Sequence, residues 1–130
     1  MKITLNPNAK DVATRDALVA EGGFGKYYTD HMVMCEWSEK DGWGEPHLMP
    51  YGPISLDPAT AVFHYGQEIF EGMKAYRQPD GSVALFRPTA NAKRFANSAK
   101  RLALPEMPVE LFMETVEALV KQDAGWVPSK

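Results

Sequence analysis

The sequence predicts an α+β domain, in which a mostly antiparallel sheet is followed by helices that pack against it. Short apolar runs separated by Gly, Pro and Asp fill residues 31–86, and such runs are typical of strands and turns. Two segments with helical periodicity follow, separated by prolines. Strands first and helices last favour α+β architecture over alternating βαβ units.

The first half of the chain predicts one helix, one strand and an irregular connection. Residues 11–20 indicate a short helix within a polar N-terminal arm. In residues 31–37 apolar side chains occupy both alternating faces, which indicates a strand covered on both sides. Residues 38–53 are rich in Gly and Pro and hold an Asp-Gly pair, so a turn and irregular structure are expected there.

Extended pieces and a hairpin are expected next. Residues 54–56 and 61–63 indicate short strands or extended pieces around a bend at an Asp-Pro pair. Residues 73–76 and 83–86 flank a Pro-Asp-Gly turn. Because Asp and Gly tolerate positive φ, this pattern predicts a β-hairpin.

Two amphipathic helices are expected after the hairpin. Pro88 occupies a first helical position, where its missing N–H is harmless, and an apolar stripe with helical spacing runs from it to Leu102. Prolines end that helix. A second stripe begins at Val109, and Gly125 is expected to close it.

Composition predicts one globular domain. The 130 residues are 45% hydrophobic and 24% charged, with a formal net charge of -3. No basic cluster is present, so neither nucleic acid nor an anionic membrane is expected as a partner. No apolar run approaches the ~20 residues of a membrane helix. The N-terminus lacks a secretory pattern and Cys35 is the single cysteine, so we expect a cytoplasmic location.

No self-contained catalytic or metal site stands out in the sequence. The histidines lack metal-ligand spacing, so we expect surface or hydrogen-bonded side chains and no bound metal. Cys35 lies in an apolar run and predicts a buried, unreactive thiol. Glu68 and Glu71 could pair as a general acid and base, but neighbouring carboxylates are common on surfaces, and two surface side chains are the favoured interpretation. The histidines are His31, His47 and His64.

Arg94 is a candidate anion-binding residue. It precedes Phe95 of the apolar stripe and therefore lies about 100° around the helix from it. A planar guanidinium there can hold a phosphate or carboxylate through two hydrogen bonds. From the residues alone, however, a solvated helix charge is the favoured explanation.

Residues 24–105 resemble a known enzyme family. FGKYYTDHMVMCEW (24–37), FHYGQEIFEGMKAYR (63–77) and LFRPTANAKRFANSAKRLALP (85–105) occur in order with short spacers. Together they resemble the N-terminal half of a branched-chain amino acid aminotransferase. These are pyridoxal 5'-phosphate enzymes of fold type IV, in class IV of the aminotransferases.

The resemblance implies a fold and an activity. Residues 1–130 would form the small N-terminal domain, with an antiparallel sheet and packed helices. The complete enzyme would transfer the amino group of leucine, isoleucine or valine to 2-oxoglutarate, giving glutamate and a branched-chain 2-oxo acid, and would be a homodimer. Its Schiff-base lysine would lie in a C-terminal domain absent from this chain. The isolated chain is therefore expected to be inactive and to bind the cofactor weakly or not at all.

The resemblance also assigns roles to four residues. Arg94 in NAKRF matches the arginine that binds the cofactor phosphate. Phe24, Tyr65 and Phe70 match aromatic residues that wall the substrate side-chain pocket, where branched aliphatic groups need an apolar surface. No catalytic residue of the chain itself is implied.

Two alternatives remain open at this point. Another fold type IV enzyme, a D-amino acid aminotransferase or an aminodeoxychorismate lyase, would share the architecture and the cofactor. A non-catalytic binding or dimerisation module would apply if the native chain ended near Lys130. The preference among leucine, isoleucine and valine and the biosynthetic or degradative use also stay open.

Overall fold

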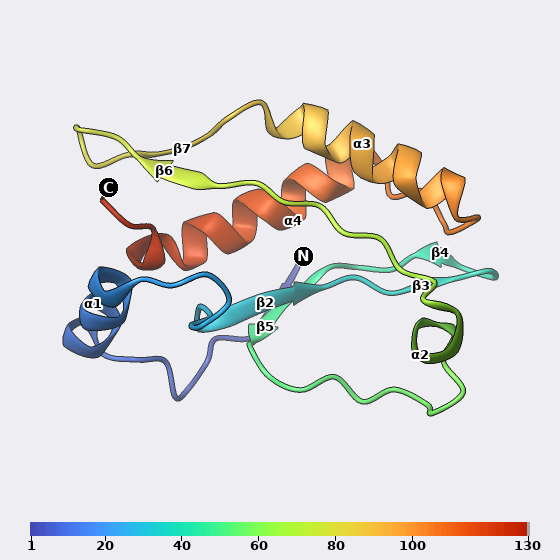
Figure 1. Ribbon diagram of the computed structural model, residues 1–130, viewed down its shortest axis with the longest axis horizontal. Coiled ribbons are helices and arrows are strands. Elements are labelled where there is room, and N and C mark those ends of the chain that lie inside the picture. The colour runs from blue at the N-terminus through green and yellow to red at the C-terminus, as the bar shows by residue number, and fades with distance from the viewer. Residues whose placement is uncertain (130) are drawn as a thin grey trace.

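The computed structural model describes residues 1–129 and confirms the α+β class (Figure 1). Its main sheet has the strand order β1-β5-β2. The strands are β1 (Lys2–Ile3), β5 (His47–Pro50) and β2 (His31–Met34). β2 pairs antiparallel with β5, whereas β1 runs parallel to it. This sheet is therefore mixed, but with the two β-hairpins described below most strand pairings are antiparallel, as the sequence predicts.

Two long helices form a layer over this sheet. Helix α4 (Val109–Gln122) packs on β2 and β5, and α3 (Pro88–Arg101) packs on α4 from the other side (Figure 1). Pro88 opens α3 at its first turn, as predicted. Because α4 lies between the sheet and α3, one face of α3 contacts neither the sheet nor α4.

Two β-hairpins extend from the layers. β3 (Trp37–Ser38) pairs with β4 (Gly42–Trp43), and β6 (Ala75–Arg77) pairs with β7 (Val83–Leu85). The second hairpin confirms the prediction, and Gly81 in its turn has φ 85°, a conformation that glycine adopts without steric cost.

Three short helical elements complete the chain: α1 (Val12–Glu21), α2 (Ala61–Tyr65) and the 3₁₀ turn η1 (Ala124–Trp126). Asp11 caps α1 by accepting a 2.9 Å hydrogen bond from the Thr14 N–H, which satisfies one of the free donors of the first turn. Helix α1 contacts η1. This contact brings the N-terminal arm beside the C-terminal end of the described chain (Figure 1).

A small apolar core lies between the layers. Leu48 of β5 is its one large side chain that is fully buried among the described residues. The rings of Phe95 in α3 and Phe112 in α4 pack with centroids 5.3 Å apart. Ala92 and Ala99 are buried where α3 approaches α4, because small side chains let two helices come close.

Four expectations about local structure are wrong. Residues 38–53 are not irregular, since they contain β4 and β5, and β5 is the central strand. Residues 61–63 belong to helix α2 and are not extended. Residues 31–37 form an interrupted strand whose side chains after His31 are at most half-buried. Gly125 does not close α4, which ends at Gln122. For β4 and β5 the reason is strand pairing, which overrides a weak local pattern.

One buried network joins three distant parts of the chain. Asp123, just after α4, accepts a 2.9 Å hydrogen bond from the main-chain N–H of His31 and a 2.7 Å bond from its ring Nδ1. His31 Nε2 accepts a 2.9 Å bond from the N–H of Asn6. Because Nε2 accepts, the neutral ring carries its proton on Nδ1 and donates it to Asp123.

Asp30, the neighbour of His31, holds a second buried network. Its carboxylate accepts hydrogen bonds from the indole Nε1 of Trp126 at 2.9 Å and from the N–H of Lys10 at 3.1 Å. Burial acts to raise the pKa of Asp30, but these donors and the Lys10 charge outweigh it, and the pKa is lowered overall. The carboxylate therefore stays ionised and ties η1 to the N-terminal arm.

The chain leaves much of its surface uncovered. Its solvent-accessible area is 9389 Å², whereas a compact monomer of 14.5 kDa exposes about 6,900 Å². The excess of about 2,500 Å² includes large apolar side chains such as Ile54, Leu56 and Phe86. Large apolar side chains exposed in this number are expected where another part of the protein or a partner covers them.

The buried network predicts a large stability loss for Asp123→Ala. The substitution leaves two donors of His31 without an acceptor, so we expect the free energy of unfolding to fall by about 2–5 kcal/mol. Urea denaturation of the purified protein measures it. Asp16→Ala is the control, because Asp16 pairs with Arg15 on the surface and should cost less than about 1 kcal/mol. Equal effects of the two variants would contradict the role given to Asp123.

Candidate functional site

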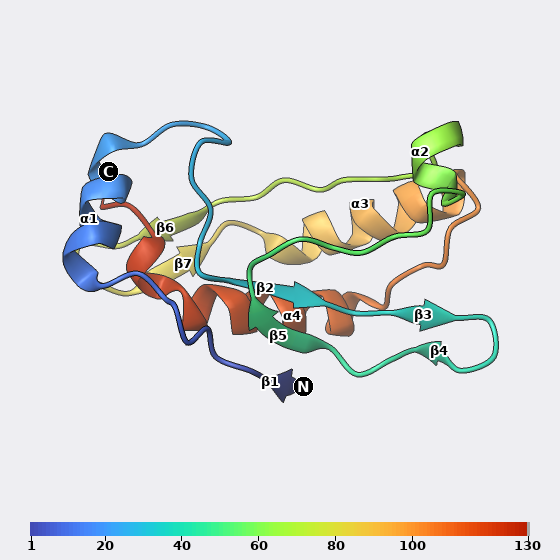
Figure 2. The same ribbon diagram turned by 90° about the horizontal axis from the view of Figure 1, so that it is seen from below.

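The candidate site lies where an irregular segment runs beside α3. Residues 66–74 connect α2 to β6 and follow α3 in the opposite direction (Figures 1 and 2). Gln67 Nε2 donates to the carbonyl of Leu102 at the end of α3, at 3.3 Å. Asn91 Nδ2, in the first half of α3, donates to the carbonyl of Gly72 at 3.0 Å. These bonds fix the segment along the helix.

Side chains of this segment alternate between two faces. Ile69, Glu71 and Met73 are partly buried, whereas Phe70 and Lys74 are exposed. This is the period of an extended chain, even though no partner strand is paired here. Glu71 therefore faces α3, and Phe70 faces away from it.

Glu71 and Arg94 form the main polar contact of the site. Two of the three guanidinium nitrogens of Arg94, Nε and Nη2, donate to the Glu71 carboxylate. The bond from Nη2 is 2.9 Å long. Asn91 Nδ2 donates to Glu71 Oε2 at 2.7 Å, and the N–H of Gly72 donates to the same oxygen at 3.0 Å. The Glu71 side chain is only 7% exposed, so the carboxylate is a buried acceptor with several donors.

This environment keeps Glu71 ionised. The hydrogen bonds from Arg94 lower its pKa to about 2, with further lowering by Asn91 and by the Arg94 charge, against the opposing effect of burial. The carboxylate raises the pKa of Arg94 in turn. Glu71 therefore carries no proton to donate at neutral pH, and the structure does not support it as a general acid beside Glu68.

Arg94 keeps part of its guanidinium open. Its side chain is 67% exposed although one edge is held by Glu71, and within residues 1–129 the structure records no hydrogen bond from Nη1. A fork with one anchored edge and one free edge is suited to an incoming oxyanion. The predicted anion-binding role of Arg94 is chemically compatible with this geometry, and it stays a prediction.

The aromatic residues of the predicted pocket wall are all on the surface. Phe24, Tyr65 and Phe70 are 109%, 86% and 91% exposed. The segment between α1 and β2, which carries Phe24, lies at the opposite end of the long axis from α2 (Figures 1 and 2). The structure thus brings Glu71, Asn91 and Arg94 together but does not bring Phe24 to the other rings.

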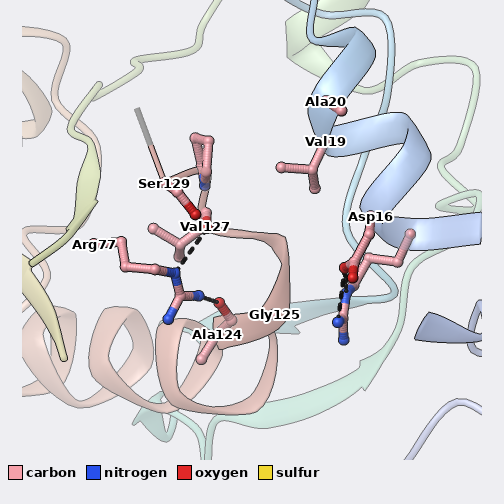
Figure 3. A pocket seen from close by; sticks show the side chains of 10 residues that line it. Asp16, Val19, Ala20, Arg77, Ala124, Gly125, Val127 and Ser129 are labelled. Atoms are coloured by element: carbon pink, nitrogen blue, oxygen red, sulfur yellow. Dashed lines mark hydrogen bonds and ion pairs between the residues drawn. The ribbon is translucent and has the colours of Figure 1, made fainter. Parts of the chain in front are cut away.

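A separate groove has a cavity volume of about 790 Å³. Figure 3 shows Arg77, whose guanidinium donates to the main-chain carbonyls of Ala124 and Val127. Arg15, which also lines the groove, pairs with Asp16. None of the predicted site residues lines it. The groove is therefore separate from the site around Arg94 and Glu71.

The other candidate residues of the sequence analysis, the histidines and Cys35, have structural contacts. His47 bonds Thr4 and His64 bonds the carbonyl of Pro58, which confirms the hydrogen-bonded histidines together with His31. Cys35 is half-buried, and burial, with the Glu114 charge, raises its thiol pKa, as expected for an unreactive thiol.

Residues 1–129 contain neither a cluster of metal-ligating side chains nor a helix that could span a membrane. No group of three or more His, Cys, Asp and Glu side chains is placed to hold a metal ion in that range. Over the same described range, every helix is too short or too polar to cross a membrane.

Glu71 and Asn91 are the functional candidates that sequence reasoning missed. The sequence pairs Glu71 only with Glu68. Glu71 and Asn91, which contact Arg94, lie 23 and 3 positions from it. The one local signal is the Asn91–Arg94 spacing, which places both side chains on the same face of a helix. The contact with Glu71 depends on the path of residues 66–74, which no local pattern specifies.

Fold and site together define an α+β domain with an anchored, partly exposed arginine, and sequence comparison identifies its relatives. No protein-family model matches the chain. A probable branched-chain-amino-acid aminotransferase of Streptomyces coelicolor is 55% identical over 129 residues, which are 98% of this chain and 36% of that protein. The branched-chain-amino-acid aminotransferase of Mycolicibacterium smegmatis is 52% identical over 126 residues, 97% of this chain and 34% of that protein.

A eukaryotic protein shows the same relation. The mitochondrial branched-chain-amino-acid aminotransferase of Saccharomyces cerevisiae is 45% identical over 128 residues, 98% of this chain and 32% of that protein. The chain spans about a third of the length of the curated relatives that it matches. It is homologous to branched-chain-amino-acid aminotransferases over that third, which confirms the resemblance.

The depressed pKa of Glu71 predicts a loss of stability in acid. An ionised group with a lowered folded pKa contributes stability above its ordinary value of 4.5, and this is lost as the pH falls toward about 2. The shift corresponds to about 3 kcal/mol, which solvent around the exposed guanidinium should reduce to about 1–2 kcal/mol. Urea midpoints at pH 6 and pH 3 should therefore differ less in Glu71→Gln than in the native protein.

Glu68→Gln is the control for this measurement, because Glu68 is exposed and has no resolved contact with Arg94. It should preserve the pH dependence of the native protein. A Glu71→Gln protein with an unchanged pH dependence would show that the ion pair does not stabilise the fold.

Proposed function

We propose that the chain is part of a pyridoxal 5'-phosphate-dependent transaminase. The proposed reaction transfers the amino group of leucine, isoleucine or valine to 2-oxoglutarate and gives glutamate and a branched-chain 2-oxo acid. The observation that carries this proposal is the 55% identity over 98% of the chain to a probable branched-chain-amino-acid aminotransferase. Identity at this level across almost the whole chain supports a shared role for the matching positions.

The proposed cofactor contact is between Arg94 and the phosphate of pyridoxal 5'-phosphate. When bound, this cofactor supplies the electron sink for the amino-group transfer. Arg94 would orient its phosphate end through charge-assisted hydrogen bonds from the free edge of the guanidinium. Its exposed position and its other, anchored edge support this assignment. Because one contact of this kind gives weak affinity by itself, other parts of the protein would supply the rest.

The proposed substrate wall consists of Phe24, Tyr65 and Phe70. Rigid rings give apolar contact area at small entropic cost, which suits a branched aliphatic side chain. Their exposure supports a role toward something outside residues 1–129, because a ring that only filled the core would be buried. In this proposal the pocket closes when further parts of the protein, or a second subunit, cover these rings.

The proposed assembly is a homodimer that acts in the cytoplasm. The excess surface of about 2,500 Å² is in the range that obligate interfaces bury. The net charge of -3, without a basic cluster, supports small-molecule substrates over nucleic acid. We also propose that residues 1–130 are the small N-terminal domain and that the lysine that reacts with the cofactor lies beyond them. Lys130 itself is outside the described residues.

A substrate panel tests the proposal. The protein that contains residues 1–130 is incubated with pyridoxal 5'-phosphate, 2-oxoglutarate and each of leucine, isoleucine and valine, and the glutamate produced is measured. We expect glutamate with all three substrates and none from the isolated 130-residue chain. Activity confined to D-alanine, or pyruvate released from aminodeoxychorismate, would instead identify one of the other fold type IV enzymes. No reaction with any substrate would favour a non-catalytic module.

The substrate wall predicts a defect for Tyr65→Ala. Loss of one apolar ring from the pocket should lower kcat/KM for leucine by about 10- to 100-fold. Phe63→Ala is the matched control, since Phe63 is an exposed ring in the same helix α2 with no proposed substrate contact, and it should keep kcat/KM within about 2-fold. An unchanged kcat/KM in Tyr65→Ala would remove Tyr65 from the pocket.

A further inference from the structure

We propose that Glu71 is a positioning residue that holds the guanidinium of Arg94 so that its Nη1 edge faces the cofactor phosphate. This inference rests on the proposed role of Arg94. It adds a second residue to the phosphate site, from a segment 23 positions earlier in the chain. The proposal is based on two observations: the Glu71 carboxylate is buried and held by several donors, and the Arg94 side chain that it binds is largely exposed.

Glu71 is fixed by contacts that do not involve Arg94. Asn91 Nδ2 and the N–H of Gly72 both donate to Oε2 of its carboxylate. Asn91 also bonds the Gly72 carbonyl, which holds the main chain beside Glu71. A side chain with three such restraints and 7% exposure has little freedom to follow another group. Glu71 is therefore the fixed member of the pair, and Arg94 adapts to it.

The geometry of the guanidinium decides which edge remains open. The group has five N–H donors in one plane. Nε and Nη2 point to the two oxygens of Glu71, which uses one side of the fork. One donor of Nη1 and the outer donor of Nη2 then point together along the neighbouring, end-on edge of the guanidinium. This second edge can bind two oxygens of a phosphate in the plane of the fork.

The alternative is that Glu71 competes with the phosphate for Arg94. Competition would require Glu71 to leave a site in which it has four donors, or Arg94 to release both of its bonds. The open edge makes neither change necessary, because carboxylate and phosphate can occupy two different edges of the guanidinium together. Without Glu71 the long Arg94 side chain would be free to rotate, and its ordering would then oppose binding.

The test compares two ligands that differ only in the phosphate. Dissociation constants for pyridoxal 5'-phosphate and for pyridoxal are measured by calorimetry with the protein that contains residues 1–130. The ratio is the Kd for pyridoxal divided by the Kd for pyridoxal 5'-phosphate. It reports the phosphate contact, because effects on the rest of the cofactor cancel. We expect Arg94→Gln to lower this ratio about 10- to 100-fold and Glu71→Ala to lower it about 3- to 10-fold.

Three controls separate the possible failures. Glu68→Ala removes a nearby exposed carboxylate without contact to Arg94 and should leave the ratio unchanged. Glu71→Ala in the Arg94→Gln background should have no further effect, because the residue acts through Arg94. If Glu71→Ala does not fold, the near-isosteric Glu71→Gln replaces it and should lower the ratio by at least about 2-fold.

The outcomes are distinct for the two claims. If Arg94→Gln leaves the ratio unchanged, Arg94 does not hold the phosphate and the proposed cofactor contact fails. If Arg94→Gln lowers the ratio but the Glu71 variants leave it unchanged or raise it, the cofactor contact stands and the positioning role of Glu71 is overturned. A ratio lowered by both changes, without additivity, supports the inference.

Discussion

The fold depends on the buried carboxylate of Asp123, which accepts two hydrogen bonds from His31. This contact spans 92 positions of the sequence and joins β2 to the end of α4. The bond from Asn6 to the other ring nitrogen adds the N-terminal arm. The apolar core is small, with Leu48 and Phe112 as its main buried side chains, so a satisfied polar network has a large share in fixing one arrangement.

That arrangement determines where the candidate site can form. Because α4 is fixed on the sheet, α3 takes its position from α4, and residues 66–74 take theirs from α3. Glu71 then meets Arg94 through hydrogen bonds that no element of the sheet provides. The site is thus at the end of a chain of contacts that starts at the sheet. Its chemistry is local, whereas its geometry depends on packing between helices.

Much of this could be predicted from the sequence, and the failures have physical reasons. The Asp-Gly hairpin and the helix that opens at Pro88 are specified by local residue types, so both predictions are confirmed. The central strand β5 was missed because its flanking prolines suggest a loop, while pairing on both edges makes it a strand. Arg94 was found by helical position and by resemblance. Glu71 as its partner was not, because the contact arises from tertiary packing.

The exposed rings of Tyr65 and Phe70 were also predicted only in part. Resemblance predicts that Tyr65 and Phe70 face a substrate, and the structure places both on the surface without a covering element among residues 1–129. The central claim is that Arg94, held by Glu71, receives the cofactor phosphate. A crystal structure of the protein with pyridoxal 5'-phosphate tests it most directly. We predict phosphate oxygens about 2.7–2.9 Å from Arg94 Nη1, with the bonds to Glu71 intact. A phosphate bound away from Arg94, or an Arg94 released from Glu71, would contradict the account.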